Sequence, residues 1–155
     1  MPETKSVLFV CLGNICRSPT GEGVLLRLIK ERNLESRLLV DSAGTSGYHV
    51  GQPADGRMSE CAARRGYPLL SRSRQLVHQD MHEFDLVIAM DRSNQRAIEA
   101  VNSQPTATIC LLSDFLADDW PVDVPDPYYG GEAGFEEVLD MIEAACPQIL
   151  SKLLE

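Results

Sequence analysis

The residues with the clearest chemical potential form one short stretch near the start of the chain, Cys11-Leu12-Gly13-Asn14-Ile15-Cys16-Arg17-Ser18. This stretch follows an apolar run, residues 7–10, and precedes a proline, so the pattern predicts a strand, a loop and the start of a helix. Gly13 and Asn14 are the residue types that most readily take positive φ, which would turn successive backbone N–H groups toward one point. With Ser18 as N-cap and Pro19 as the first helical residue, the free N–H groups of the helix start would face the same point. The arrangement suits a bound phosphate.

Cys11 and Arg17 supply the reactive groups of this loop. Dipoles at a helix N-terminus and a neighbouring cation stabilise a cysteine as its thiolate, so we expect Cys11 to be an anionic nucleophile at neutral pH. The guanidinium of Arg17 is always charged and can bind two oxygens of a phosphoryl group at once, which lysine cannot do. The alternative, a buried core cysteine and a surface arginine, leaves the spacing of the surrounding residues unexplained. The Gly-rich signatures of nucleotide-binding loops are absent.

A long acidic loop, residues 113–131, offers a proton donor. It contains five aspartates: Asp114, Asp118, Asp119, Asp123 and Asp126. Cleavage of a phosphate ester requires a proton for the departing oxygen, and a carboxyl group facing the nucleophile can supply it. Asp126 is the best candidate because Pro125 and Pro127 stiffen the backbone on both sides of it. The plainer alternative is a solvated acidic loop.

At this point the chain resembles a known family, the low-molecular-weight protein-tyrosine phosphatases. The resemblance starts with the stretch from Cys11 to Ser18 and continues through three further segments in order: Asp41-Ser42-Ala43-Gly44-Thr45-Ser46-Gly47-Tyr48, Met90-Asp91-Arg92-Ser93-Asn94 and Asp126-Pro127-Tyr128-Tyr129-Gly130. It therefore spans essentially the whole chain. It implies catalytic roles for Cys11, Arg17 and Asp126, and a phosphate site formed by Leu12, Gly13, Asn14, Ile15, Cys16, Arg17 and Ser18.

Supporting residues follow from the same segments. Ser18 is expected to donate to the sulfur of Cys11, and Ser42 to hydrogen-bond Asn14 and hold the loop's unusual backbone. Asp91 either buttresses the phosphate loop or caps the short helix that follows it. In the resembled family a histidine at the position of Ser71 often supports the phosphate loop. Because this chain has a serine there, the sequence does not identify which residues support the loop in its place.

Aromatic residues beside these segments predict a substrate cleft. We expect its walls to be Leu12, Tyr48, Tyr128 and Tyr129. Such a slot would accept the ring of a phosphotyrosine, whereas the short side chain of phosphoserine could not span it. The alternatives are half-exposed tyrosines and a turn serine at position 42.

The rest of the pattern predicts an α/β fold: a single domain, residues 1–155, with a four-stranded parallel twisted sheet in the order 2-1-3-4, helices on both faces, and the phosphate loop between the first strand and the first helix. Beyond the first strand, strands are expected at 38–40, 84–90 and 108–112, with residues 41–48 as a loop. Helices are expected from the phosphate loop to about 32, at 54–65, at 93–100 and from about 135. Pro147 should bend or break the last helix near 144–146.

Composition and charge limit which partners and which cellular location we expect for the protein. With 155 residues and a formal net charge of −9, the chain is large enough for a real core and too acidic for nucleic-acid binding. No apolar run approaches a membrane span, and the N-terminus lacks signal-peptide character, so we expect a cytoplasmic monomer. No cofactor or metal is expected, because His78 and His82 lack a third ligand in a catalytic pattern.

The five cysteines do not suggest a disulfide framework. Cys16 lies in the same loop as Cys11, and a reversible disulfide between them would shield the nucleophile from over-oxidation. The resemblance points the same way. We therefore expect a redox-sensitive hydrolase.

These expectations combine into a phosphotyrosine phosphatase, also active on small aryl phosphates, that works through a cysteinyl-phosphate. Three alternatives remain. An arsenate reductase of this fold would need further cysteines, which residues 78–90 lack. An arginine-phosphate phosphatase typically carries threonine where this chain has Ile15. A cysteine phosphocarrier would keep its phosphate rather than hydrolyse it.

Overall fold

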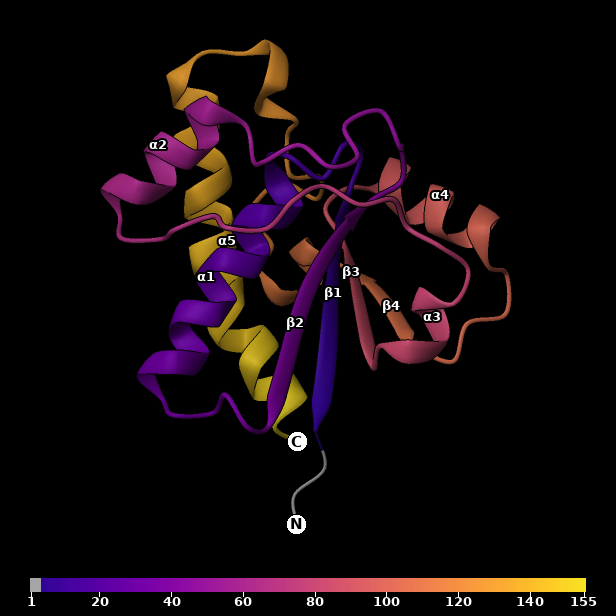
Figure 1. Cartoon of the computed structure of the whole chain (residues 1–155). Helices are drawn as coiled ribbons and strands as arrows, with labels where there is room; N and C mark the ends of the chain where they lie inside the picture. Colours follow the sequence, from indigo (N-terminus) through magenta and orange to yellow (C-terminus); the bar gives the residue numbers. More distant parts are fainter. Residues whose placement is uncertain (1–3) are drawn as a thin grey trace.

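The computed structural model describes residues 4–155, which fold around one parallel sheet (Figure 1). Its strands are β1 (Lys5–Cys11), β2 (Leu38–Gly44), β3 (Leu86–Ala89) and β4 (Thr108–Leu111), and all three neighbouring pairs are parallel. Their order is β2-β1-β3-β4, as predicted. The central strand β1 therefore ends at Cys11 with a neighbour on each side, which fixes the start of the phosphate loop.

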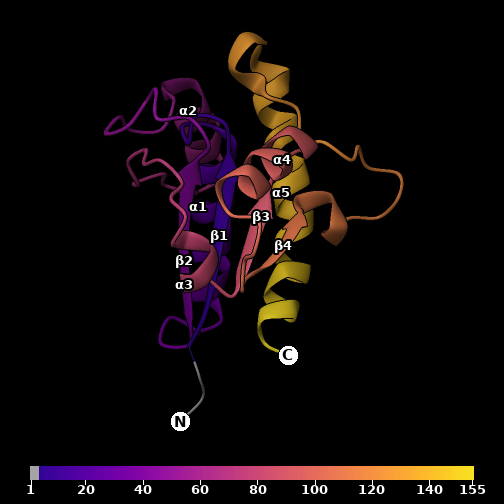
Figure 2. The same ribbon diagram turned by 90° about the vertical axis from the view of Figure 1, so that its right-hand side faces the viewer.

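Helices cover both faces of the sheet (Figures 1 and 2). They are α1 (Arg17–Glu31), α2 (Gly56–Arg64), α3 (Asp80–Glu83), α4 (Arg92–Val101) and α5 (Glu132–Leu153), with short 3-10 turns η1 (Leu112–Phe115) and η2 (Pro127–Tyr129). In Figure 1, α1, α2 and α5 lie on one side of the strands and α3 and α4 on the other. No helix in the described part of the chain is both long and apolar enough to cross a membrane.

The apolar core forms two layers because successive residues of β1 point to opposite faces. Val7 and Phe9 pack into the larger cluster with α1, α2 and α5. Leu8 and Val10 pack into the smaller cluster, which includes Met81 and Ile98. All four strand residues are fully buried, as the continuous apolar run of a central parallel strand predicts.

The close packing of α1 against β1 explains a glycine that helical propensity alone would disfavour. A Cβ on Gly21 would lie 2.7 Å from the ring of Phe9. Gly21 thus brings the helix backbone directly onto the sheet. This close approach sets the position of the helix N-terminus above Cys11.

Several predicted boundaries need correction. The prediction of Ser18 as N-cap and Pro19 as first helical residue is wrong, because α1 begins at Arg17 with Cys16 as N-cap. The second strand runs on to Gly44, since every residue from Lys5 to Cys11 pairs with it; much of the expected loop after residue 40 is strand. The third and fourth strands and α2 are one to two residues shorter at their ends than predicted.

The last helix departs from prediction more clearly. It begins at Glu132 and continues through Pro147 to Leu153 without a break. Proline cannot donate to the carbonyl four residues earlier, but Cys146, directly before it, and Ile149, two positions after it, are buried in the core. Packing along the sheet keeps this part of α5 helical (Figure 2).

Candidate active site

The loop from Cys11 to Cys16 connects the end of β1 to the start of α1 and has one residue with positive φ, Asn14, at 57°. Gly13 does not share this conformation, so the prediction for that residue is wrong. Glycine is needed at this position for a steric reason instead, because a Cβ there would lie 3.0 Å from Cδ2 of His49. Asn14 alone reverses the chain and directs its N–H group inward.

The sulfur of Cys11 is buried in this loop, with the residue 2% exposed. The backbone N–H of Asn14 donates to it at 3.3 Å, and the hydroxyl of Ser18 lies 3.0 Å away. Because Ser18 is in the first turn of α1, the sulfur also lies next to the positive end of the helix dipole. These contacts favour negative charge on the sulfur.

The side-chain amide of Asn14 orders the hydrogen bonds around the sulfur. Its Oδ1 accepts the backbone N–H of Arg74 at 3.0 Å. Its Nδ2 must therefore donate, and it lies 2.8 Å from Oγ of Ser18 and 3.0 Å from Oγ of Ser42. Since Ser18 accepts from Asn14, its own proton is free for Cys11, with only a longer contact of 3.4 Å to the carbonyl of Ala43 competing.

The predicted hydrogen bond between Ser42 and Asn14 is thus present, and the network continues beyond it. Ser42 donates to Oε1 of Glu22 at 2.6 Å. Burial raises the pKa of Glu22, while the hydroxyls of Ser42 and Ser71 oppose that rise. Glu22 is a residue that the sequence analysis missed.

Arg17 is buried, with 2% of the residue exposed, and two hydrogen-bond acceptors fix its guanidinium. Its Nη1 donates to Oδ2 of Asp91 at 2.6 Å and to the carbonyl of Val124 at 3.0 Å. Burial alone would lower the pKa of Arg17, but the charge on Cys11 and the bond to Asp91 raise it above its ordinary value. The guanidinium stays charged.

Asp91 serves both of the roles that the sequence left open. Its Oδ1 accepts the N–H of Asn94 at 2.7 Å and caps α4. Its Oδ2 pairs with Arg17. One carboxylate therefore ties the start of a helix on one face of the sheet to the phosphate loop.

Asp126 lies on the opposite side of the same guanidinium, with 3.7 Å between its Oδ2 and Nη2 of Arg17. Its Oδ1 accepts the N–H of Tyr128 at 3.1 Å and caps η2. The segment before it is fastened to the sheet by the N–H of Val124, which donates to the carbonyl of Met90 at 3.0 Å. The segment after it is fastened to α2, where Arg57 donates to the carbonyl of Tyr128 at 3.0 Å.

These groups surround one cavity of about 390 Å³. Its floor includes Cys11 and Arg17, and the predicted wall residues line it together: Leu12, Tyr48, Tyr128 and Tyr129. Tyr48 and Tyr129 are largely exposed, at 85% and 92%, so they form its rim. Asn14, Ser18, Ser42 and Asp91 lie behind the cavity, not on its surface.

The cavity also contains residues that the sequence analysis did not identify. His49 rests against Gly13, and its ring meets that of Tyr48 edge-on at 4.8 Å between centroids. Ser46 lines the same wall. The signal for both was their place in the segment from Asp41 to Tyr48 or directly after it, where only Ser42 and Tyr48 were singled out.

Comparison with known proteins agrees with this geometry. The family model described as low molecular weight phosphotyrosine protein phosphatase matches residues 6–155. The chain belongs to this family. The human low molecular weight phosphotyrosine protein phosphatase is 41% identical over 152 residues, which cover 96% of each chain.

Solved structures of family members superpose closely. A protein tyrosine phosphatase from Entamoeba histolytica, with Hepes in its active site, has a TM-score of 0.92 and 43% identity, and the match covers 97% of both chains. The structure described as DARP, the Drosophila arginine phosphatase, has a TM-score of 0.87 and 33% identity, over 94% of this chain and 96% of that one. The fold thus accompanies more than one described activity.

Position 71, where the resembled family often has a histidine, is a serine in this chain, and the observed hydrogen bonds behind the loop run through other residues. Ser42 accepts a hydrogen bond from Asn14 and donates one to Glu22. The hydroxyl of Ser71 opposes the rise in the pKa of the same carboxyl group.

The Arg17–Asp91 pair yields a stability prediction. The Asp91→Asn variant keeps an oxygen for capping α4 but removes the nearest counter-charge of a buried guanidinium, so the free energy of unfolding should fall by about 2–4 kcal/mol. Urea denaturation measures this. The matched control is Asp123→Asn, which breaks the exposed pair with Arg92 and should change the free energy of unfolding far less, because solvent screens that pair. Equal losses in the two variants would contradict the role given to Asp91.

Proposed function

We propose that this protein hydrolyses phosphotyrosine in proteins, and small aryl phosphates, through a cysteinyl-phosphate intermediate. The observation that carries the proposal is the convergence of Cys11, Arg17 and Asp126 on one cavity. A nucleophile, a fork-shaped cation and a carboxyl group are the parts that phosphoryl transfer from an aryl oxygen requires.

In the first step the thiolate of Cys11 attacks phosphorus in line with the leaving group. The S–P bond forms as the P–O bond to the phenol breaks, and Asp126 gives its proton to the departing oxygen. Arg17 and the N–H groups of the phosphate loop bind the equatorial oxygens, whose charge they stabilise. The products are free tyrosine hydroxyl and phosphorylated Cys11.

In the second step Asp126, now a carboxylate, takes a proton from water as that water attacks phosphorus. The S–P bond breaks and inorganic phosphate forms. The hydroxyl proton of Ser18, which the amide of Asn14 directs toward the sulfur, stabilises the leaving thiolate. Neither step needs a metal ion.

The walls of the cavity favour an aromatic substrate. Leu12 and the rings of Tyr48, Tyr128 and Tyr129 rise around the phosphate site, so a substrate ring would be held between apolar surfaces. The apolar Ile15 stands where arginine-phosphate phosphatases typically carry threonine. This favours phosphotyrosine over the activity described for the Drosophila relative.

The setting that we propose is a cytoplasmic monomer in which residues 1–155 form a single phosphatase domain. The net charge of −9 disfavours nucleic acid as a partner. The odd number of cysteines, without a disulfide framework, is typical of a reducing compartment. The partners are phosphotyrosine-containing proteins, and free phosphate or similar oxyanions would occupy the loop.

The test is a comparison of matched substrates. Phosphotyrosine, phosphoserine and phosphoarginine peptides of one sequence are assayed with the protein in EDTA, with arsenate reduction measured alongside. We expect turnover of the phosphotyrosine peptide, inhibition by vanadate, and no turnover by Cys11→Ser. Activity surviving in Cys11→Ser, faster release from phosphoarginine, or a stable cysteinyl-phosphate in the unaltered protein would overturn the proposal.

The role of Asp126 predicts a dependence on the leaving group. In Asp126→Asn, kcat for phenyl phosphate should fall by about 10²–10⁴, because general acid catalysis contributes that much when the departing oxygen is basic. The loss should be smaller for nitrophenyl phosphate, whose leaving oxygen needs less protonation. The control Asp118→Asn changes an aspartate of the same loop that does not line the cavity. A uniform loss across leaving groups would contradict the assignment.

Cys16 gives the proposal a redox component. Burial, with the charges of Asp55 and Cys11, raises the pKa of the Cys16 thiol. Peroxide would therefore oxidise Cys11, giving a sulfenic acid with loss of hydroxide. The Cys16 thiol would then attack that sulfur and release water, leaving a disulfide that dithiothreitol reduces.

This order of events predicts the behaviour of Cys16→Ser. After brief peroxide treatment, dithiothreitol should restore most of the activity of the unaltered protein and much less of that of the variant, because the variant lacks a resolving thiol. Recovered activity is the measurement. Cys110→Ser is the control, since Cys110 lies outside the cavity. Equal recovery in all three proteins would contradict a role for Cys16.

A further inference from the structure

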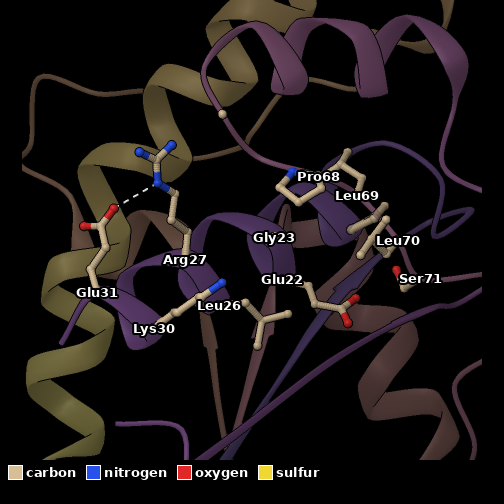
Figure 3. Close-up of a pocket in the computed structure, with 12 residues that line it drawn as sticks. Glu22, Gly23, Leu26, Arg27, Lys30, Glu31, Pro68, Leu69, Leu70 and Ser71 are labelled. Carbon is tan, nitrogen blue, oxygen red and sulfur yellow. Dashed lines mark hydrogen bonds and ion pairs between the residues drawn. The ribbon is translucent and has the colours of Figure 1, made fainter. Parts of the chain in front are cut away.

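A second cavity, of about 610 Å³, lies between α1 and the segment that follows α2 (Figure 3). We call it the α1 groove, and its apolar walls are formed by Leu26, Pro68, Leu69 and Leu70. The segment is seated tightly on the helix, because a Cβ on Gly23 would lie 2.6 Å from Cδ2 of Leu69. Leu26 and Leu70 are 44% and 86% exposed, so hydrocarbon faces water along the groove.

The two ends of the α1 groove differ in charge. Figure 3 shows Glu22 and Ser71 at one end and Arg27, Lys30 and Glu31 at the other. Arg27 is already engaged, since its Nε pairs with Glu31 at 2.9 Å and its Nη1 donates to the carbonyl of Arg65 at 2.8 Å. The basic end would repel a cationic group, and the Glu22 end would attract one.

Glu22 makes no direct ion pair with a lysine or arginine of the described residues 4–155. The charge of Arg74 acts on it only from a longer distance, and the hydroxyl of Ser42 donates to it at 2.6 Å. A carboxylate offers about four acceptor positions, so positions remain for another donor. A half-buried carboxylate gains most from a charged donor.

We propose that the α1 groove binds small amphiphilic amines, with the ammonium at Glu22 and the hydrocarbon chain against Leu26, Leu69 and Leu70. The volume is that of a typical small-molecule site, roughly 300–1,000 Å³. Apolar contact supplies affinity along the groove, and the ammonium supplies a directly bonded counter-ion for Glu22. The orientation is fixed because the opposite end carries Arg27 and Lys30.

Occupancy of the α1 groove is coupled to the phosphate loop. An ammonium beside Glu22 favours the ionised carboxylate, which accepts the hydrogen bond that Ser42 donates. Ser42 then keeps its lone pairs for the amide of Asn14. The backbone signals of Ser42 and Asn14 should therefore respond to a ligand that touches neither residue.

The first test uses the unaltered protein. An isotope-labelled sample is titrated with phenylbutylamine and, separately, with the neutral phenylbutanol, each with and without orthovanadate in the phosphate loop. We expect saturable shifts of amide signals in residues 19–31 and 66–71 with the amine, with or without vanadate. The alcohol should bind at least about tenfold more weakly, because it lacks the charge-assisted bond. Equal affinity for the two, or shifts that vanadate abolishes, would overturn the proposal.

The second test uses matched carboxylates at the two ends of the α1 groove. Glu22→Gln should weaken amine binding at least about tenfold and leave alcohol binding unchanged, since it removes only the charge. Glu31→Gln should change amine binding by less than about twofold, because that carboxylate already pairs with Arg27. Unchanged amine binding by a folded Glu22→Gln would overturn the proposal. If that variant does not fold, the comparison of amine and alcohol decides.

Discussion

The orientation of one side-chain amide, that of Asn14, determines how the hydroxyls of Ser18 and Ser42 are used. An amide can be turned either way, but the N–H of Arg74 occupies its oxygen side. Both protons of the amide nitrogen are then given to Ser18 and Ser42. Each serine, having accepted one bond, directs its own proton outward, one to the sulfur of Cys11 and the other to Glu22. A donor fixed before substrate arrives costs no reorganisation when charge develops on the sulfur.

The side chain of Arg17 is likewise fixed in position before substrate binds. A guanidinium has two edges, and this one uses Nη1 for Asp91 and for the carbonyl of Val124, which leaves Nη2 toward the cavity and Asp126. Because these contacts join the ends of β3 and the acidic loop to the phosphate loop, the position of the cation is determined by three segments that are far apart in the sequence. The long side chain loses its rotamer freedom in folding, so none of that entropy is lost on binding phosphate.

Patterns within short segments predicted most of the fold and the reacting groups. Apolar runs alternating with helical patterns indicated a parallel α/β sheet, whose strand order follows from the family resemblance. The residue types from Cys11 to Ser18 indicated a phosphate site. The supports escaped prediction because they depend on distant pairs. The N–H of Arg74 reaches Asn14 across 60 residues, and a backbone group leaves no trace in residue type. Local rules also lost to packing: α1 begins before the Ser-Pro pair, and α5 continues through Pro147.

The charges around the cavity constrain the proposed chemistry further. One cation, Arg17, lies among three acidic groups, Cys11, Asp91 and Asp126, on a chain whose net charge is already −9. A phosphate dianion entering this cavity meets favourable backbone dipoles and the Arg17 guanidinium, but it also meets Cys11 on the floor and Asp126 on the wall. In the proposed reaction Asp126 gives a proton to the leaving oxygen. A carboxyl group that carries this proton does not repel the incoming phosphate. The same proton thus serves both substrate binding and departure of the leaving group in the proposed mechanism.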